Sequence, residues 1–542
     1  MATRTWDGGG ADNLASTAGN WSDDTAPIAG DAVVFDATSS DPCTFDLTAA
    51  FLSINSTGYT GTITASVTIS VSGGITFANS TFAHGNQEII ITSTQTVDVG
   101  NNELYKLTFN NVNNIVTLNS NITVNNTLDL GLTFNGKTVN GNTIFAKGNV
   151  IGTGYSISSG TTTIEFSGTG IQTWTAPANS GQIGTPIIIN KSGGSLTLSG
   201  TFLIENNFTF TAGTVDAGTS TMNFGKSSTT IVITSGTMSF YNLSFRLSAV
   251  TITLADNLTI TNIFDMQDSF NGITVNGNKI FAQGDVKGTG YGVNAGTTVL
   301  EFSGGNNQTW YTPANSAIIG LAIIINKSGN TLTLNNGDTF LLSGGITYTA
   351  GTVVTTNTTI KTSGTNNWNS GTLAWNNWEV ASGTTTLTGN LDVNGVLTIT
   401  GTLSCGSNTI NCAGNFTRAG TFTEGTSTII FDGTSTVSGT ETFNNLTIAS
   451  GATVHLTSTQ TFTVSGAFTT LGTSTLDAVT GGSRANLPVN GSQSVVGVTA
   501  TDIDSSGGSI KPISNVGGTN SNTISWNTGL VIISKLSLLG VG

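Results

Sequence analysis

The sequence predicts an all-β fold, a parallel β-helix (β-solenoid) built from internal repeats, and three observations support this prediction. Apolar and polar residues alternate with period two over short segments, without a helical stripe. A long segment of the chain is duplicated at a fixed offset. Mainly Gly, Asn, Ser and Thr stand between the short segments, and 70 of the 542 residues are Gly. A solenoid explains all three, because each coil of roughly 20 to 25 residues supplies short strands that pair with neighbouring coils.

The composition indicates a folded chain with a weakly charged surface. Hydrophobic residues make up 37% of the sequence, enough to bury an extended apolar core, whereas charged residues make up only 8%. Thr, Ser and Asn are expected to face solvent between the inward residues, since Thr is both polar and β-branched. The net charge of −14 disfavours nucleic acid and anionic membranes as partners, and no apolar run reaches the roughly 18 residues of a membrane-spanning helix.

The duplication has a period of 136 residues: Phe134–Asn142 recurs as Phe270–Asn278. The same offset holds without a gap through four further pairs of motifs. These pairs are Gly152–Tyr155 and Gly288–Tyr291, Glu165–Gly168 and Glu301–Gly304, Gln172–Trp174 and Gln308–Trp310, and Ile187–Gly193 and Ile323–Gly329. A smaller unit of paired short strands lies inside each copy, as expected if one coil is the basic repeat.

The ends of the chain differ from the repeats, which predicts three regions. Residues 1–45 are interpreted as an N-terminal cap or attachment segment, and residues 46–478 as the solenoid with its 136-residue duplicated units. Residues 479–542, which end in the strand-like segment from Leu530, are interpreted as a C-terminal cap or small β domain. Caps are expected because an open coil exposes unpaired backbone groups that would otherwise polymerise.

Residue patterns that would indicate catalysis are weak. Glycoside hydrolysis needs two carboxylates about 5 to 10 Å apart in one groove, whereas the acidic residues of this chain are scattered. Glu165 and Glu301 occupy equivalent positions of the duplication, which favours a repeated turn or cross-coil contact, since an active site should be unique. We therefore expect no catalytic residues and no enzymatic activity.

Metal and cofactor sites are not expected either. His84 and His455 are far apart and have no metal-ligand context. The loop that starts at Asp502 begins like an EF-hand, but its twelfth position is Ile513 in place of the required Glu. The three cysteines are too few for a disulfide framework and are expected to be buried thiols: Cys43, Cys405 and Cys412.

Tryptophans are the remaining candidates for ligand contact. Trp174 and Trp310 stand in equivalent turns of the two copies, and three more follow in a cluster: Trp368, Trp375 and Trp378. Exposed aromatic faces stack on sugar rings, so these five residues are candidate glycan contacts. Rings buried in a solenoid would give the same sequence pattern, and packing in the core is the preferred interpretation.

Two sets of motifs carry a resemblance to a known class of proteins. The chain opens with Trp6–Gly10, Asn20–Trp21 and Gly30–Phe35, and continues with Leu-Thr-Ile and Ile-Asn-Lys-Ser-Gly repeats. In this combination it resembles adhesin-like β-solenoid repeat proteins of phage virions and bacterial surfaces. The resemblance implies a structural or adhesive role and supplies no catalytic residues.

We therefore expect a non-enzymatic appendage, in the form of a phage virion fibre, tail or capsid-decorating protein on the virion surface. Its expected partners are other virion or surface proteins, contacted through the N-terminal segment, and a host surface glycan; a homotrimer is an open alternative. Met1–Gly8 lacks the apolar region of a secretory signal, which favours assembly in the cytoplasm and release by lysis.

Other functions stay open at this point. One is a bacterial adhesin at the cell surface or outside the cell, exported without a cleaved signal. Another is a polysaccharide depolymerase tailspike whose catalytic site lies between protomers. Ice binding through flat Thr rows is disfavoured, because no Thr-x-Thr motif repeats strictly at one coil position.

Overall fold

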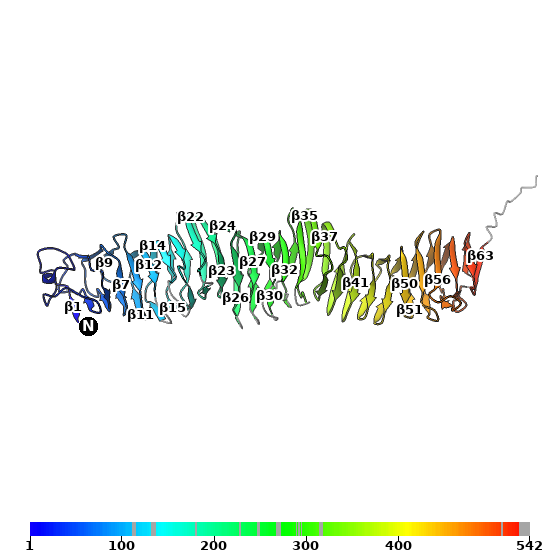
Figure 1. Ribbon diagram of the computed structural model, residues 1–542, viewed down its shortest axis with the longest axis horizontal. Helices are drawn as coiled ribbons and strands as arrows, with labels where there is room; N and C mark the ends of the chain where they lie inside the picture. Colours follow the sequence, from blue (N-terminus) through cyan, green and yellow to red (C-terminus); the bar gives the residue numbers. More distant parts are fainter. Residues whose placement is uncertain are drawn as a thin grey trace, which may run out of the picture. The chain divides into compact units, whose positions relative to one another are not determined.

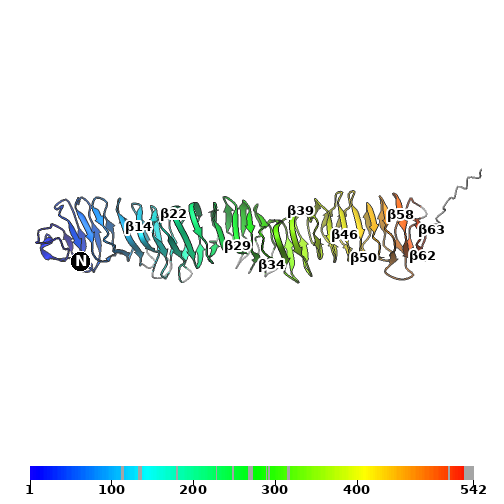
Figure 2. The same ribbon diagram turned by 90° about the horizontal axis from the view of Figure 1, so that it is seen from above.

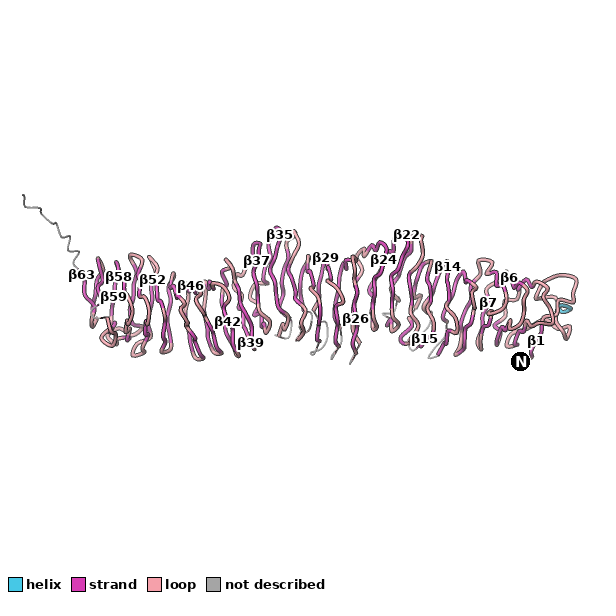
Figure 3. The backbone as a smooth tube through the Cα atoms, turned by 180° about the vertical axis from the view of Figure 1, so that it is seen from behind, coloured by secondary structure: helices cyan, strands magenta, loops and turns pink. Residues whose placement is uncertain are grey.

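The computed structural model describes residues 1–529 except 111–114, 132–136, 155, 179–180, 227–228, 247–249, 267–272, 289, 291–292, 294, 314–317 and 511–512. The described residues form strands, turns and loops with one short 3-10 helix, η1 (Ala18–Asn20), drawn in cyan in Figure 3. The chain divides into two compact units: unit 1 is Met1–Ala282 with Gly296–Thr298, and unit 2 is Gln283–Ala295 with Val299–Gly542. Both are parallel β-solenoids, with about 22 turns in all, so the predicted fold class is confirmed.

Unit 1 is built from parallel sheets whose strands come from successive coils (Figure 1). An 8-stranded sheet extends from β1 (Thr3–Thr5) to β18 (Ile157–Ser159), and a 14-stranded sheet from β4 (Ala50–Phe51) to β30 (Thr274–Gly277). A 3-stranded sheet contains β3 (Cys43–Phe45), β6 (Thr62–Ala65) and β9 (Thr81–Ala83). A further run of paired strands is β21 (Gln182–Ile183), β23 (Thr201–Ile204), β25 (Thr221–Phe224), β27 (Ser239–Phe245), β29 (Leu258–Asp265) and β31 (Ile280–Ala282).

Unit 2 has the same construction, and Figure 2 shows several of its strands as successive rungs. One run of paired strands is β33 (Val299–Phe302), β35 (Ala322–Leu334), β37 (Ile346–Val354), β39 (Thr365–Asn369), β42 (Thr384–Leu387), β45 (Thr402–Ser404) and β48 (Thr421–Thr423). A 10-stranded sheet extends from β36 (Thr339–Leu342) to β62 (Thr519–Ser521). A 9-stranded sheet extends from β40 (Ala374–Trp375) to β63 (Trp526–Gly529).

The alternation in the sequence becomes an alternation between core and surface. In the parallel pair β53 (Thr453–Leu456) and β56 (Ser474–Ala478), Val454 lies opposite Leu476 and both are buried. One position earlier, Thr453 lies opposite Thr475 and both face outward. Each fully buried Val or Leu stabilises the fold by about 1.5 to 3 kcal/mol, so the column of inward side chains holds neighbouring coils together.

Equivalent glycines show that the duplication is structural as well as sequential. Gly141 and Gly277 adopt φ values of +103° and +102°, a region that side chains of L-residues rarely adopt. A Cβ atom would lie 2.3 Å from the carbonyl oxygen of Leu118 at the first position and of Leu254 at the second. Both corners therefore require glycine for conformation and for space.

The parallel ladder continues across both predicted region boundaries. β2 (Ala32–Val34), within residues 1–45, pairs with β5 (Ser53–Asn55), which lies beyond them. β59 (Val498–Thr501) pairs with β56 on the other side of residue 478. Residues 479–529 thus extend the solenoid of unit 2, and the predicted strand from Leu530 lies outside the described residues, as do Phe134, Tyr155, Phe270 and Tyr291 of the repeat motifs.

Candidate functional site

The five tryptophans considered as glycan contacts are core residues. Trp174, Trp310, Trp368, Trp375 and Trp378 each have an exposed fraction of 0%. The ring centroid of Trp174 lies 4.9 Å from that of Phe166 and 4.5 Å from that of Phe202. Because no ring face reaches solvent, these residues pack in the core, which is the interpretation that the sequence favoured, and none of them is placed to contact a glycan.

Two of these indoles share one hydrogen-bond acceptor. Trp368 and Trp375 donate their Nε1–H groups to Ser370 Oγ, at 2.9 and 2.8 Å. The rings of Trp368 and Trp375 meet edge to face, with centroids 5.4 Å apart. This cluster packs in the core of unit 2 and presents no ring face to a ligand.

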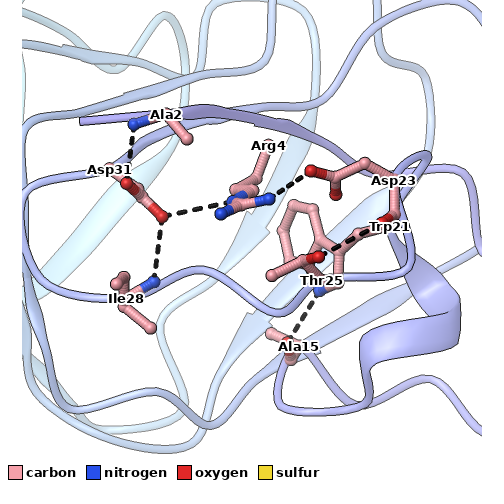
Figure 4. Close-up of polar contacts among 8 residues, drawn as sticks. All are labelled: Ala2, Arg4, Ala15, Trp21, Asp23, Thr25, Ile28 and Asp31. Carbon is pink, nitrogen blue, oxygen red and sulfur yellow. Dashed lines mark hydrogen bonds and ion pairs between the residues drawn. The ribbon is translucent and has the colours of Figure 1, made fainter.

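A charged cluster in the N-terminal segment joins Arg4 to Asp23 and Asp31 and stabilises the local fold (Figure 4). Arg4 Nε donates to Asp31 Oδ2 at 3.2 Å, and Arg4 Nη1 donates to Asp23. Asp31 also accepts the backbone N–H groups of Ala2, at 2.8 Å, and Ile28, at 3.3 Å. The hydrogen bond from Ala2 is the main reason that the pKa of Asp31 lies below its usual value. These carboxylates fasten the chain start to the first coil.

The repeated glutamates make the same contact in both copies. Asn190 Nδ2 donates to Glu165 Oε1 at 2.9 Å, and Asn326 Nδ2 donates to Glu301 Oε1 at 2.9 Å. In each case the two residues come from successive coils. The interpretation of Glu165 and Glu301 as cross-coil contacts is therefore confirmed.

Two lysines that the structure buries were not predicted from the sequence. Lys191 and Lys327 are exposed by only 2% and 3%, and each follows the repeated Ile-Ile-Ile-Asn motif. Lys191 Nζ donates to Gly168 O and Gly170 O, both at 2.9 Å, and to Gln172 Oε1 at 2.5 Å. Lys327 Nζ donates to Gln308 Oε1 at 2.6 Å and to a backbone carbonyl.

Carbonyl oxygens of backbone and glutamine stabilise these ammonium groups, and among the described residues neither lysine forms an ion pair. Burial lowers the pKa of both lysines. The strict repetition of Gln-Thr-Trp and Ile-Asn-Lys at one offset is the sequence signal that could have identified the pair. The arrangement ties three stretches of backbone together and leaves no position for a substrate.

Other titratable groups form separate pairs. His455 Nδ1 contacts Asp477 Oδ1, and the ring of His84 packs 5.5 Å from that of Tyr105. Glu441 is buried, and burial raises its pKa to about 7, with Arg418 as an opposing influence. Arg418 Nε lies 2.7 Å from Glu441 Oε2 but does not make a well-directed hydrogen bond to it.

Cysteine and metal chemistry find little support among the described residues. Cys43, Cys405 and Cys412 are buried free thiols, and burial raises the pKa of each. No group of three or more His, Cys, Asp or Glu side chains converges in the described ranges. Asp502 accepts hydrogen bonds from Gly482 N, at 2.8 Å, and from Asn522, so its loop is closed by internal contacts.

The outer surface of unit 2 carries in-register columns of hydroxyl side chains. Five threonines oppose one another along one sheet: Thr434, Thr453, Thr475, Thr499 and Thr519. A second column of four is formed by Thr365, Thr384, Thr402 and Thr421. Neighbouring strands of a sheet lie about 4.8 Å apart, which fixes the spacing of these hydroxyl groups.

Comparisons of this chain with protein-family models, with curated proteins and with solved structures gave no match. Within the described part of the chain, no helix has the length and apolar character needed to cross a membrane. Any functional conclusion must therefore come from the parallel solenoid and the chemistry of its surface.

Proposed function

We propose that this protein is a non-enzymatic structural or adhesive appendage, in the form of a phage virion fibre, tail or capsid-decorating protein. One observation carries the proposal: outward residues form in-register columns of uncharged hydroxyl groups, as in the column from Thr434 to Thr519. A repeated array of weakly binding polar groups suits multivalent attachment, because many small contacts at one spacing add up in avidity.

The charged residues support the same proposal. Several lysines are held in ion pairs with glutamates of other coils: Lys106 with Glu88, Lys147 with Glu103, Lys226 with Glu205, and Lys361 with Glu379. Each pair joins side chains that lie on different coils. The charges therefore serve contacts between coils.

Mass spectrometry of purified particles tests this proposal. Particles from a culture that carries the gene should contain the protein in several copies, and immunogold label should decorate their surface. Absence from purified particles would overturn the virion assignment. Release of the protein from intact bacteria by brief protease treatment would then favour the bacterial adhesin.

A polysaccharide depolymerase is the second candidate, and one observation favours it. Asp392, beside a cavity of about 150 Å³ that is also lined by Asn411, has its pKa raised by burial and then by the charge of Asp432. The pKa of Asp432 is itself raised by burial. Asp392 lies in β43 (Leu391–Val393) and Asp432 directly follows β49 (Thr428–Phe431) of the same sheet, and glycoside hydrolysis uses two carboxyl groups of this kind.

A reducing-sugar assay on host capsule or lipopolysaccharide tests this alternative. Turnover that is lost in both Asp392→Asn and Asp432→Asn would establish the depolymerase and overturn the non-enzymatic proposal. Absence of turnover by the purified full-length protein would exclude it for those substrates.

A further inference from the structure

A cleft of about 490 Å³ opens on the surface of unit 1. Its walls are the second half of β24 (Phe208–Asp216) with the turn that follows, residues 237–241 at the start of β27, and Thr261 of β29. This volume lies within the range of about 300 to 1,000 Å³ that is typical of ligand sites.

The cleft exists because β26 (Thr230–Thr234), the strand that pairs with β24 in the next coil, is shorter than β24. β24 pairs with β22 (Ile187–Ser199) from Phe208 through Asp216. On its other side only Phe208 and Thr209 pair with β26 (Thr230–Thr234). The chain then turns back, with Met238 N donating to Ser235 O at 2.9 Å. Beyond Thr209, the edge of β24 that faces β26 has no described strand partner and borders the cleft.

A β-bulge in β29 lies opposite Tyr241, beside this space. The register between β27 and β29 shifts between Phe240 and Asn242, so that Tyr241 alone lies opposite two residues of β29, Thr261 and Asn262. Phe240 and Leu243 point into the core, whereas Tyr241 is partly exposed and lines the cleft. Bulges reorient side chains in this way next to functional sites.

The lining combines an aromatic ring with hydroxyl groups and one carboxylate. Thr214, Thr237, Ser239 and Thr261 contribute hydroxyl groups, and Phe210 and Met238 form an apolar floor. Asp216 Oδ1 accepts the N–H of Gly218 at 2.9 Å. Hydroxyl and carboxylate oxygens bind the hydroxyl groups of a sugar, while an aromatic ring packs against its C–H face.

We propose that this cleft binds a neutral or amine-bearing saccharide, with Tyr241 as the stacking residue and Asp216 as a hydrogen-bond acceptor. Among the described residues that line the cleft there is no Lys, Arg or His, and the charge of Asp216 repels anionic ligands. This inference rests on the adhesive part of the proposed function and names the ligand class for it.

An extended peptide added to the open edge of β24 is the competing occupant. Gly213, within that edge, has a φ of +113° and so departs from extended backbone. A peptide could not continue a regular ladder past this point, and peptide binding would not need the ring of Tyr241. The saccharide is therefore favoured.

The second copy provides a natural control. β37 pairs with β35 from Ile346 through Val354, but only Ile346 and Thr347 pair with β39, so the same narrowing recurs. Matching β24 to β37 places Val354 at the position of Asp216, and matching Ser235–Leu243 to Ser370–Trp378 places Asn376 at that of Tyr241. Tyr241→Asn and Asp216→Val are thus substitutions that this fold already accommodates.

Isothermal titration of the full-length protein tests the proposal with four probes: chitohexaose, glucosamine hexamer, cellohexaose and hexagalacturonate. At least one of the first three should bind at a single site with Kd of about 1 mM or tighter. Tyr241→Asn and Asp216→Val should each weaken that binding at least tenfold, whereas Asn376→Ala in the second copy should leave it unchanged. Hexagalacturonate should bind more weakly than the hexamer that binds best.

Three results would overturn this assignment. The first is that none of the three neutral or amine-bearing hexamers binds. The second is that both cleft variants bind the hexamer as tightly as the parent protein does. The third is that an alternating Thr-Val hexapeptide displaces the bound hexamer and also binds the Tyr241→Asn variant normally. Each result is independent of whether the protein occurs in particles, so failure of the cleft and failure of the appendage proposal are distinguishable.

Discussion

Trp174 in the first copy of the repeat and Trp310 in the second occupy nearly identical aromatic surroundings. The centroid of Trp174 lies 4.9 Å from that of Phe166, and the centroid of Trp310 lies 4.9 Å from that of Phe302. The side chains that line the cleft differ: Tyr241 and Asp216 correspond to Asn376 and Val354. The aromatic contacts in the core are thus the same in both copies, whereas the side chains that line the cleft in the first copy differ from their counterparts in the second.

One difference between the copies lies inside the core. Lys137 and Ile273 are separated by 136 residues and both are fully buried. Burial lowers the pKa of Lys137 to about 8, although the charge of Asp129 acts in the opposite direction. The same buried site therefore holds a charged residue in one copy and an apolar residue in the other.

The largest effect is expected from truncation of the shared tryptophans. Trp174→Ala and Trp310→Ala should each lower the free energy of unfolding of their own unit by about 3 to 5 kcal/mol, because a large cavity is left in a close-packed core. Denaturant titration followed by hydrogen exchange measures this loss and locates it. Thr173→Ala, at a neighbouring outward position, is the control and should change stability by less than about 0.5 kcal/mol. Losses below about 1 kcal/mol at both tryptophans would contradict their role in core packing, and a large loss at only one would contradict the equivalence.

The shared buried lysines should give the next largest effect. Lys191→Met should destabilise unit 1 by about 2 to 4 kcal/mol, because the acceptors Gly168 O, Gly170 O and Gln172 Oε1 lose their donor. Lys327→Met should have a similar effect on unit 2. Lys106→Met removes a more exposed lysine that pairs with Glu88, and should cost less than about 1 kcal/mol. Equal effects at Lys106 and Lys191 would contradict the role of the buried hydrogen bonds.

A smaller, pH-dependent effect is expected at Glu441, which has no counterpart in the duplicated segment. Its folded-state pKa of about 7 lies above the ordinary value of 4.5. The unfolded chain therefore loses this proton first, and stability should fall as the pH rises from about 4.5 to 7. Glu441→Gln removes this ionisation, so the variant should gain up to about 3 kcal/mol over the parent protein between pH 4.5 and pH 8. Parallel pH profiles of the two proteins, measured by denaturant titration, would rule out the raised pKa.

The smallest effect is expected when buried Lys137 is replaced by the residue that the second copy has at the equivalent position. Lys137→Ile introduces the residue found at the equivalent position of the second copy. Asp129 keeps hydrogen bonds from Gly131 N, at 3.1 Å, and from Thr153 N, at 3.2 Å. Stability at pH 7 should therefore change by less than about 1 kcal/mol, as measured by thermal unfolding. A loss above about 3 kcal/mol would show that Asp129 depends on the lysine.

The sequence was sufficient to predict the parallel solenoid, since alternation, corner glycines and the 136-residue offset are explained together by stacked coils. It could not decide whether Trp174 and Trp310 face inward, because both were expected in turns. That expectation is wrong: Trp174 lies in β20 (Gln172–Thr175) and Trp310 in β34 (Gln308–Pro313), and both side chains are buried. The exposure of Tyr241 depends on a bulge and on the short length of β26, and neither leaves a motif. Region boundaries near residues 45 and 478 were drawn where the repeat fades, although backbone pairing does not require the repeat to persist.

The central claim is that strands of successive coils stack in parallel and in register, and nitroxide labels on one column test it most directly. Thr365, Thr384, Thr402 and Thr421 lie on four successive strands of unit 2. Pairs of these threonines are replaced by cysteine for labelling in a variant that lacks the three native cysteines. The backbones of the labelled residues should be about 5, 10 and 15 Å apart when the two residues lie one, two and three strands apart in the sheet. The account predicts dipolar broadening that weakens regularly with each step. Equal or irregular broadening across the three pairs would contradict parallel stacking in register.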